Sequence, residues 1–114
     1  MKRTITRRIR TVTAFGLATM ALGACTPEVY IDQVFGTQAA AAKSVAMCES
    51  TMNPGAVSPG GGNHGLFQIN NVHRATFEQV TGQPWSAVYD PYWNAFFAKY
   101  LVDQSGWQPW SCRP

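Results

Sequence analysis

Residues 37–50 read TQAAAAKSVAMCES, a run of alanine and other residues with high helix propensity. Thr37 is a suitable N-cap for a helix here, and the Asn-Pro-Gly at residues 53–55 disfavours helix beyond that point. Apolar side chains recur at spacings of four, three and four residues: Ala41, Val45, Cys48 and Met52. We therefore predict an amphipathic helix with this set as its buried face and with Glu49 at the edge of that face.

A glycine-rich loop is predicted directly after this helix. Residues 56–64 (AVSPGGGNH) hold a proline and three consecutive glycines, which neither a helix interior nor a central strand accommodates. Residues 65–70 (GLFQIN) alternate weakly between apolar and polar and indicate a short extended piece. Because no regular alternation of strands and helices follows, the fold class is mostly α.

Two further helices are predicted in the second half of the chain. Asn70 or Asn71 can cap a helix that ends at Gly82, and Asp90 with Pro91 can open another that reaches about residue 104. The side chains expected to be buried are Val72, Phe77 and Val80 on the first of these and Trp93, Phe96, Phe97, Tyr100 and Leu101 on the second.

The charge distribution excludes a nucleic-acid binder. The 114 residues suffice for one small domain, and the net charge is +3. Five of the nine basic residues lie within the first ten, so from residue 25 onward four basic residues face all six acidic ones. The folded part therefore lacks the positive charge that phosphate contacts need.

The first 24 residues have the pattern of an export signal. A basic stretch precedes twelve mostly apolar residues at 11–22, too short a run for a bilayer core that needs about 20 residues. Leu22-Gly23-Ala24-Cys25 resembles a bacterial lipobox, which implies acylation of Cys25 and a membrane-anchored lipoprotein of the cell envelope. The alternative is ordinary cleavage near Ala24, which would leave Cys25 as a free thiol.

The cysteines fit this division of the chain. Export leads to an oxidising compartment, where Cys48 and Cys112 can pair while Cys25 carries the lipid. The pair would close a loop of about 65 residues and contribute about 4 kcal/mol in the chain-entropy treatment. The predicted organisation is a signal at 1–24, a tether at 25–36 and a helical domain at 37–114, small enough to need such a cross-link.

Short motifs occur in a fixed order over residues 38–112: Cys48-Glu49-Ser50, Asn53-Pro54, Ala56-Val57-Ser58, GLFQIN at 65–70, Tyr89-Asp90-Pro91, Asn94 and Tyr100-Leu101. Together they resemble the lytic transglycosylase domain of the lysozyme-like superfamily. The resemblance implies a small lysozyme-like helical domain with a Gly-rich cleft loop. The Ala-Tyr-Asn-Ala-Gly motif of larger members is missing, so the ending is more similar to the short, disulfide-closed exported members.

The resemblance also implies roles for individual residues. Glu49 corresponds to the catalytic acid and base, Ser58 lies near it and the substrate, and Gly65, Leu66, Phe67 and Gln68 line the cleft. Gln68 and Asn70 are candidate sugar-binding amides or, equally, turn and cap residues, and Ser58 can be a turn residue. The implied substrate is the β-1,4 bond between N-acetylmuramic acid and N-acetylglucosamine in peptidoglycan glycan strands.

A single acid is sufficient for one form of this chemistry. Glycoside cleavage ordinarily uses two carboxyl groups, and no second acid in the sequence is an obvious partner for Glu49. A lytic transglycosylase needs one: the acid protonates the glycosidic oxygen and then deprotonates the C6 hydroxyl, giving a 1,6-anhydro end. Because the acid must hold its proton near neutrality, we expect an apolar setting of Val45, Met52 and Phe67 around it.

Two alternatives and two exclusions complete the sequence reading. A muramidase of the same fold would let water complete the reaction, and a non-catalytic lipoprotein would only bind the cell wall. His64 and His73 with Cys48 fit no zinc spacing, so no metal and no cofactor are expected. The partners expected are peptidoglycan and, through the anchor, a membrane; protein partners are unknown.

Overall fold

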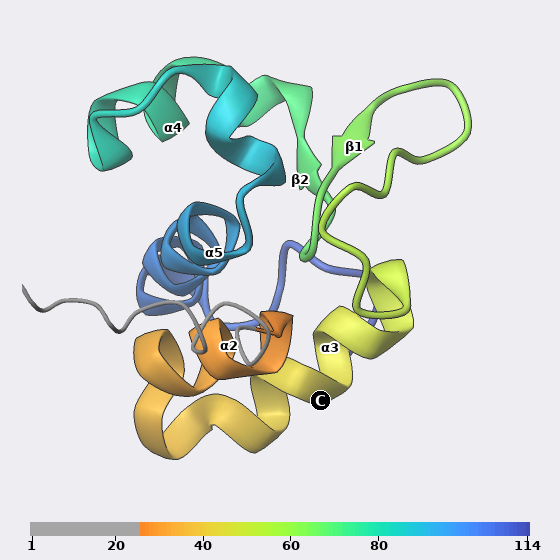
Figure 1. The fold of residues 1–114 in the computed structure, drawn as a ribbon, viewed down its shortest axis with the longest axis vertical. Helices are drawn as coiled ribbons and strands as arrows, with labels where there is room; N and C mark the ends of the chain where they lie inside the picture. Colours follow the sequence, from red (N-terminus) through yellow and green to blue (C-terminus); the bar gives the residue numbers. More distant parts are fainter. Residues whose placement is uncertain (1–25) are drawn as a thin grey trace, which may run out of the picture.

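The computed structural model describes residues 26–114, and in this part of the chain helices dominate, as the predicted class requires (Figure 1). The α-helices are α2 (Pro27–Phe35), α3 (Ala39–Ser50), α4 (Arg74–Thr81) and α5 (Pro91–Ser105). The 3-10 helices η3 (Gly36–Gln38), η4 (Asn71–His73) and η5 (Trp85–Tyr89) lie between them, and strands β1 (Asn63–His64) and β2 (Ile69–Asn70) pair antiparallel. The predicted signal and the predicted acylation site at Cys25 lie outside the described residues.

Helix α5 is the centre of the domain and lies between α2 and α4 (Figure 1). Its predicted start is confirmed: Oδ1 of Asp90 accepts hydrogen bonds from the N–H groups of Tyr92 and Trp93, and Pro91 occupies the first turn. Of its predicted apolar face, Phe97 is fully buried and the other four side chains are half-buried. None of the helices among residues 26–114 is long and apolar enough to cross a membrane.

Helix α2 replaces most of the predicted tether. Thr26 and Pro27 form its N-terminus, and Ile31 and Phe35 are buried in the core. The ring of Phe35 packs against Phe67 and Trp107, with centroids 5.6 and 5.8 Å apart. Residues 27–35 of the segment predicted as a tether are therefore a helix that belongs to the domain. Two apolar positions four residues apart carry little periodic signal alone, so the spacing did not predict this helix.

The predicted apolar face of α3 is also partly wrong. The fully buried residues are Ala42, Val45 and Ala46, whereas Cys48 is exposed. The helix starts after η3 and ends at Ser50, a few residues before the predicted stop. In a run this rich in alanine several faces are apolar, and tertiary packing against the rest of the core selects among them.

The chain between α3 and α4 forms a short antiparallel unit. β1 pairs with β2, and Val57 forms an isolated bridge with His64, so the Gly-rich segment folds back along β1. The predicted cap at Asn70 is confirmed, since its side chain accepts from the N–H of Val72 and opens η4 ahead of α4. Val72 itself is 80% exposed, which corrects its predicted place in the core.

Candidate active site

Glu49 occupies the last turn of α3, where the chain reverses sharply. Thr51 and Met52 adopt left-handed backbone conformations (φ 54° and 63°), and the N–H of Thr51 donates to the carbonyl of Met47. Non-glycine residues adopt this conformation at a cost that surrounding contacts must offset. The reversal exposes the end of α3 to the segment that follows, and Glu49 is half-buried there.

An open groove with a volume of about 670 Å³ runs beside the end of α3. Its walls are the residues that end the helix and the Gly-rich segment that faces them: Glu49, Ser50, Thr51, Asn53, Gly55, Ala56, Val57, Ser58, Pro59, Asn63 and Gln68. Glu49 is the one carboxyl group among these lining residues. Glu49 is thus the single acid that the lining residues offer to a ligand in the groove.

The surroundings of Glu49 are more polar than expected. Val45 and Phe67 are fully buried in the core and Met52 is half-buried, while most lining residues of the groove carry polar side chains. The carboxylate oxygen Oε2 accepts a hydrogen bond from the backbone N–H of Cys112, with N and O 3.2 Å apart. One oxygen of Glu49 is therefore held by the C-terminal tail.

The tail reaches Glu49 through two fixed points. The predicted disulfide between Cys48 and Cys112 is present, with Cα atoms 6.1 Å apart. Trp110, only 5% exposed, donates from Nε1 to the carbonyl oxygen of Phe67 at 2.8 Å. The C-terminal residues consequently contact the cleft segment at Phe67 and return to α3 at Cys48.

Ser50 connects the end of α3 to the turn at residues 65–68. Its hydroxyl oxygen lies 2.7 Å from the carbonyl oxygen of Leu66, to which it donates, and it accepts from the N–H of Asn53 at 3.1 Å. Both bonds are largely shielded from solvent, since Ser50 is 8% exposed. Ser50, the serine next to the catalytic candidate, thus fixes the end of α3 to the turn at residues 65–68, a role that the sequence did not predict.

Ser58 lines the groove and also closes its loop. Its Oγ accepts from the N–H of Asn63, its N–H donates to the carbonyl of Asn63, and its own carbonyl accepts from Gly61. Ser58 is therefore a turn residue, one of the two roles that the sequence left open. The hydroxyl proton of Ser58 has no part in these bonds, so it can still donate to a ligand in the groove.

Leu66 and Phe67 are buried behind the groove and do not line it. Both side chains have no exposed area, and Gly65 is also buried. The N–H of Phe67 donates to Oδ1 of Asn94 at 2.7 Å, and Nδ2 of Asn94 donates to the carbonyl of His64 at 3.1 Å. The resemblance implied that these three residues contact the substrate directly. Their burial indicates instead that they support the groove from behind.

Gln68 and Asn70 use much of their hydrogen-bonding capacity within the protein. Nε2 of Gln68 donates to the carbonyl oxygens of Ala56 and Gly65, which leaves Oε1 as the atom that can accept from a ligand. Nδ2 of Asn70 donates to Oδ1 of Asn63, while its Oδ1 caps η4. The structural role is present for both amides, and sugar binding by Gln68 or Asn70 stays a prediction.

A smaller hollow of about 290 Å³ continues the groove past Asn63 and Gln68, which line both. It is bordered by Asn70, His73 and Trp110, among others. Burial lowers the pKa of His73 from its ordinary value, since desolvation disfavours the imidazolium. The two hollows together give an elongated cleft with Glu49 in one half.

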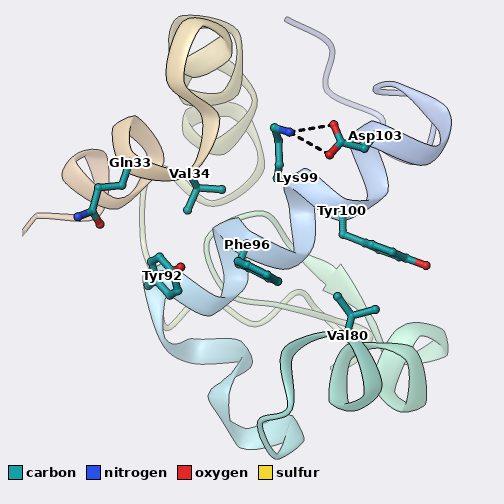
Figure 2. A pocket seen from close by; sticks show the side chains of 8 residues that line it. All are labelled: Gln33, Val34, Val80, Tyr92, Phe96, Lys99, Tyr100 and Asp103. Carbon is teal, nitrogen blue, oxygen red and sulfur yellow. Dashed lines mark hydrogen bonds and ion pairs between the residues drawn. The ribbon is translucent and has the colours of Figure 1, made fainter.

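A third hollow, of about 650 Å³, lies between α2, α4 and α5, away from Glu49. Figure 2 shows Tyr92, Phe96 and Tyr100 along α5 and the ion pair between Lys99 and Asp103. Both carboxylate oxygens of Asp103 lie 2.9 Å from Nζ of Lys99. The carboxylate of this hollow is already ion-paired with a lysine, whereas Glu49 is the one carboxyl group of the groove beside α3, so we take that groove as the candidate active site.

Residues 26–114 contain no cluster of three or more His, Cys, Asp or Glu side chains that could hold a metal ion.

A small helical domain with one carboxylic acid above an elongated groove defines a candidate glycan-cleaving enzyme. The profile of the family described as "Lysozyme like domain" matches residues 32–112, well over half of the chain, and the chain belongs to this family. Searches among curated proteins and among solved structures found no significant match. The family supports a cell-wall enzyme of the lysozyme or lytic transglycosylase type, with peptidoglycan as its substrate.

Proposed function

We propose that the protein is a peptidoglycan lytic transglycosylase in which Glu49 acts first as acid and then as base. The observation that carries this proposal is the single carboxyl group of the groove. Other carboxylates are engaged elsewhere in the described domain: Asp32 pairs with Lys43, Glu78 accepts from the N–H of Trp85, Asp90 caps α5 and Asp103 pairs with Lys99.

In the first step the proton on Glu49 moves to the glycosidic oxygen as the bond from the muramoyl C1 to that oxygen breaks. The acetamido group of the substrate stabilises the positive charge at C1. In the second step the Glu49 carboxylate takes the proton of the C6 hydroxyl as O6 bonds to C1. No water is consumed, Glu49 regains its proton, and the products are a 1,6-anhydro end and a free C4 hydroxyl.

The substitution Glu49→Gln tests the assignment with little change in shape. The glutamine oxygen can still accept from the N–H of Cys112, so the fold should be kept, but the amide cannot donate a catalytic proton. We expect cleavage of purified peptidoglycan to fall by about 10²–10⁴-fold, the usual contribution of a general acid or base. Glu28→Gln, the same change in the first turn of α2, is the control and should retain activity.

Mass spectrometry of the digest separates the transglycosylase from the muramidase. Anhydro ends in excess support the proposal, whereas free reducing ends in excess show that water completes the reaction. A wild-type protein that binds peptidoglycan but cleaves none would be the non-catalytic binding lipoprotein.

The export signal and the acylation of Cys25 remain part of the proposal, and the intact mass of membrane-extracted protein tests both.

A further inference from the structure

We propose that the Cys48–Cys112 disulfide positions the catalytic carboxyl group, by holding the backbone N–H of Cys112 against one oxygen of Glu49 so that the other oxygen carries the proton. The inference rests on the proposed role of Glu49. The N–H donor lies 3.2 Å from Oε2, and Cys48 immediately precedes Glu49 in the last turn of α3. The cross-link therefore joins the tail to the helix at the catalytic residue.

Both sides of this cross-link have other anchors. On the tail, Trp110 is buried and bonded to the carbonyl of Phe67, and its own carbonyl accepts from Nε of Arg113. On the helix, Ser50 is bonded to the carbonyl of Leu66. Because these contacts also fix the tail and α3, the local effect of the disulfide falls on the position of residue 112 relative to Glu49.

The chemistry of the donor decides where the proton resides. A backbone N–H can donate but not accept, and the C=O oxygen of a protonated carboxyl group is its stronger acceptor, so the bond to Oε2 favours the hydrogen of a protonated Glu49 on Oε1. The terminal torsion of a glutamate is broad and nearly two-fold, so without this contact either oxygen can carry the proton in either orientation. Holding Oε2 in this contact thus makes Oε1 the oxygen from which a protonated Glu49 donates.

Kinetics of the double variant Cys48→Ser/Cys112→Ser test the positioning role. We expect kcat on soluble glycan strands to fall about tenfold, equivalent to one hydrogen bond of about 1.4 kcal/mol, while KM changes less than twofold. Thr81→Val is the control for lost stability, because it removes buried hydrogen bonds to Phe77 and Gln83 at the far end of α4. All measurements use a temperature at which each variant is fully folded. A kcat within twofold of wild type, or an equal fall in Thr81→Val, overturns the inference.

A second measurement applies even if the double variant does not fold. In wild-type protein labelled with ¹⁵N, the amide proton of Cys112 should move downfield as Glu49 ionises, and this response should vanish in Glu49→Gln. The Arg113 guanidinium and the terminal carboxylate of Pro114 are near in sequence and remain in both proteins, so their effect cancels in the comparison. An amide shift of Cys112 that is the same in both proteins overturns the inference. If wild type cleaves no peptidoglycan, the proposed function fails, and this titration still decides whether Cys112 bonds to Glu49.

Discussion

Gly65 is the position where a single added methyl group should damage the domain most. Its backbone is left-handed (φ 78°), and a Cβ built there lies 2.5 Å from the carbonyl oxygen of Val88 and closer still to Nδ2 of Asn94. Gly82, at the end of α4, has a similar φ of 70° but open space around its Cβ position. The pair Gly65→Ala and Gly82→Ala therefore separates the backbone cost from the steric cost.

The expected magnitudes follow from these two terms. A left-handed alanine costs about 1–2 kcal/mol, which both variants should show. Gly65→Ala adds overpacking of about 1–3 kcal/mol. It also displaces Asn94 from the carbonyl of Val88, which leaves a buried acceptor unpaired at about 1–3 kcal/mol. We expect a loss of about 4 kcal/mol in the free energy of unfolding for Gly65→Ala and about 1 kcal/mol for Gly82→Ala.

Urea denaturation followed by tryptophan fluorescence and far-UV circular dichroism measures both values with the disulfide intact. With a slope of about 1 kcal/mol per molar urea, the midpoint of Gly65→Ala should lie about 3 M below that of Gly82→Ala. If the two variants differ by less than 1 kcal/mol, the close contacts at Gly65 do not constrain the cleft segment as described.

Two further predictions concern the buried amide of Asn94 and the partly buried imidazole of His73. Asn94→Leu keeps the side-chain volume but leaves the N–H of Phe67 and two carbonyl groups unpaired, so the free energy of unfolding should fall by about 4 kcal/mol. Gln104→Ala, at an exposed position on the same helix, is the control and should lower the free energy of unfolding by less than about 0.5 kcal/mol. Equal stabilities of the two variants would contradict the assigned bonds. Because the pKa of His73 is lower in the folded than in the unfolded protein, the unfolded chain binds a proton at this side chain at a higher pH than the folded chain does. The part of the free energy of unfolding that neutral His73 contributes above about pH 6.5 is therefore lost as the pH falls through the folded-state pKa. Denaturation midpoints between pH 7.5 and 5.5 should therefore fall more steeply for wild type than for His73→Gln, and parallel curves would refute the assignment.

The parts of the fold that the sequence predicted are those controlled by neighbouring residues. The Asp90-Pro91 start of α5 and the Asn70 cap depend on side chains that bond to N–H groups two or three residues away. The left-handed Gly82 is likewise a local signal. Each of these contacts is complete within a few residues, so a short stretch of sequence contains the whole cause.

The errors arose where distant residues decide the outcome. Helix α2 is held by Phe35 packing on Phe67 and Trp107, which are 32 and 72 positions further along the chain. The alanine-rich α3 could bury more than one face, and its partners in the core selected Ala42 and Ala46. Propensity and spacing give no information on such contacts, so the tether and the buried face were both misassigned.

The candidate site combines the two kinds of cause. Glu49 is a candidate because the ordered motifs around it resemble the lytic transglycosylase domain, and each of those motifs is a short local stretch of sequence. The contacts that surround its carboxyl group are not local: the bond from Cys112 spans 63 positions, and the bond from Ser50 to Leu66 spans 16. A sequence can therefore propose the acid of such a site, but it gives no information on the donor that contacts its carboxyl group, because that donor comes from the other end of the domain.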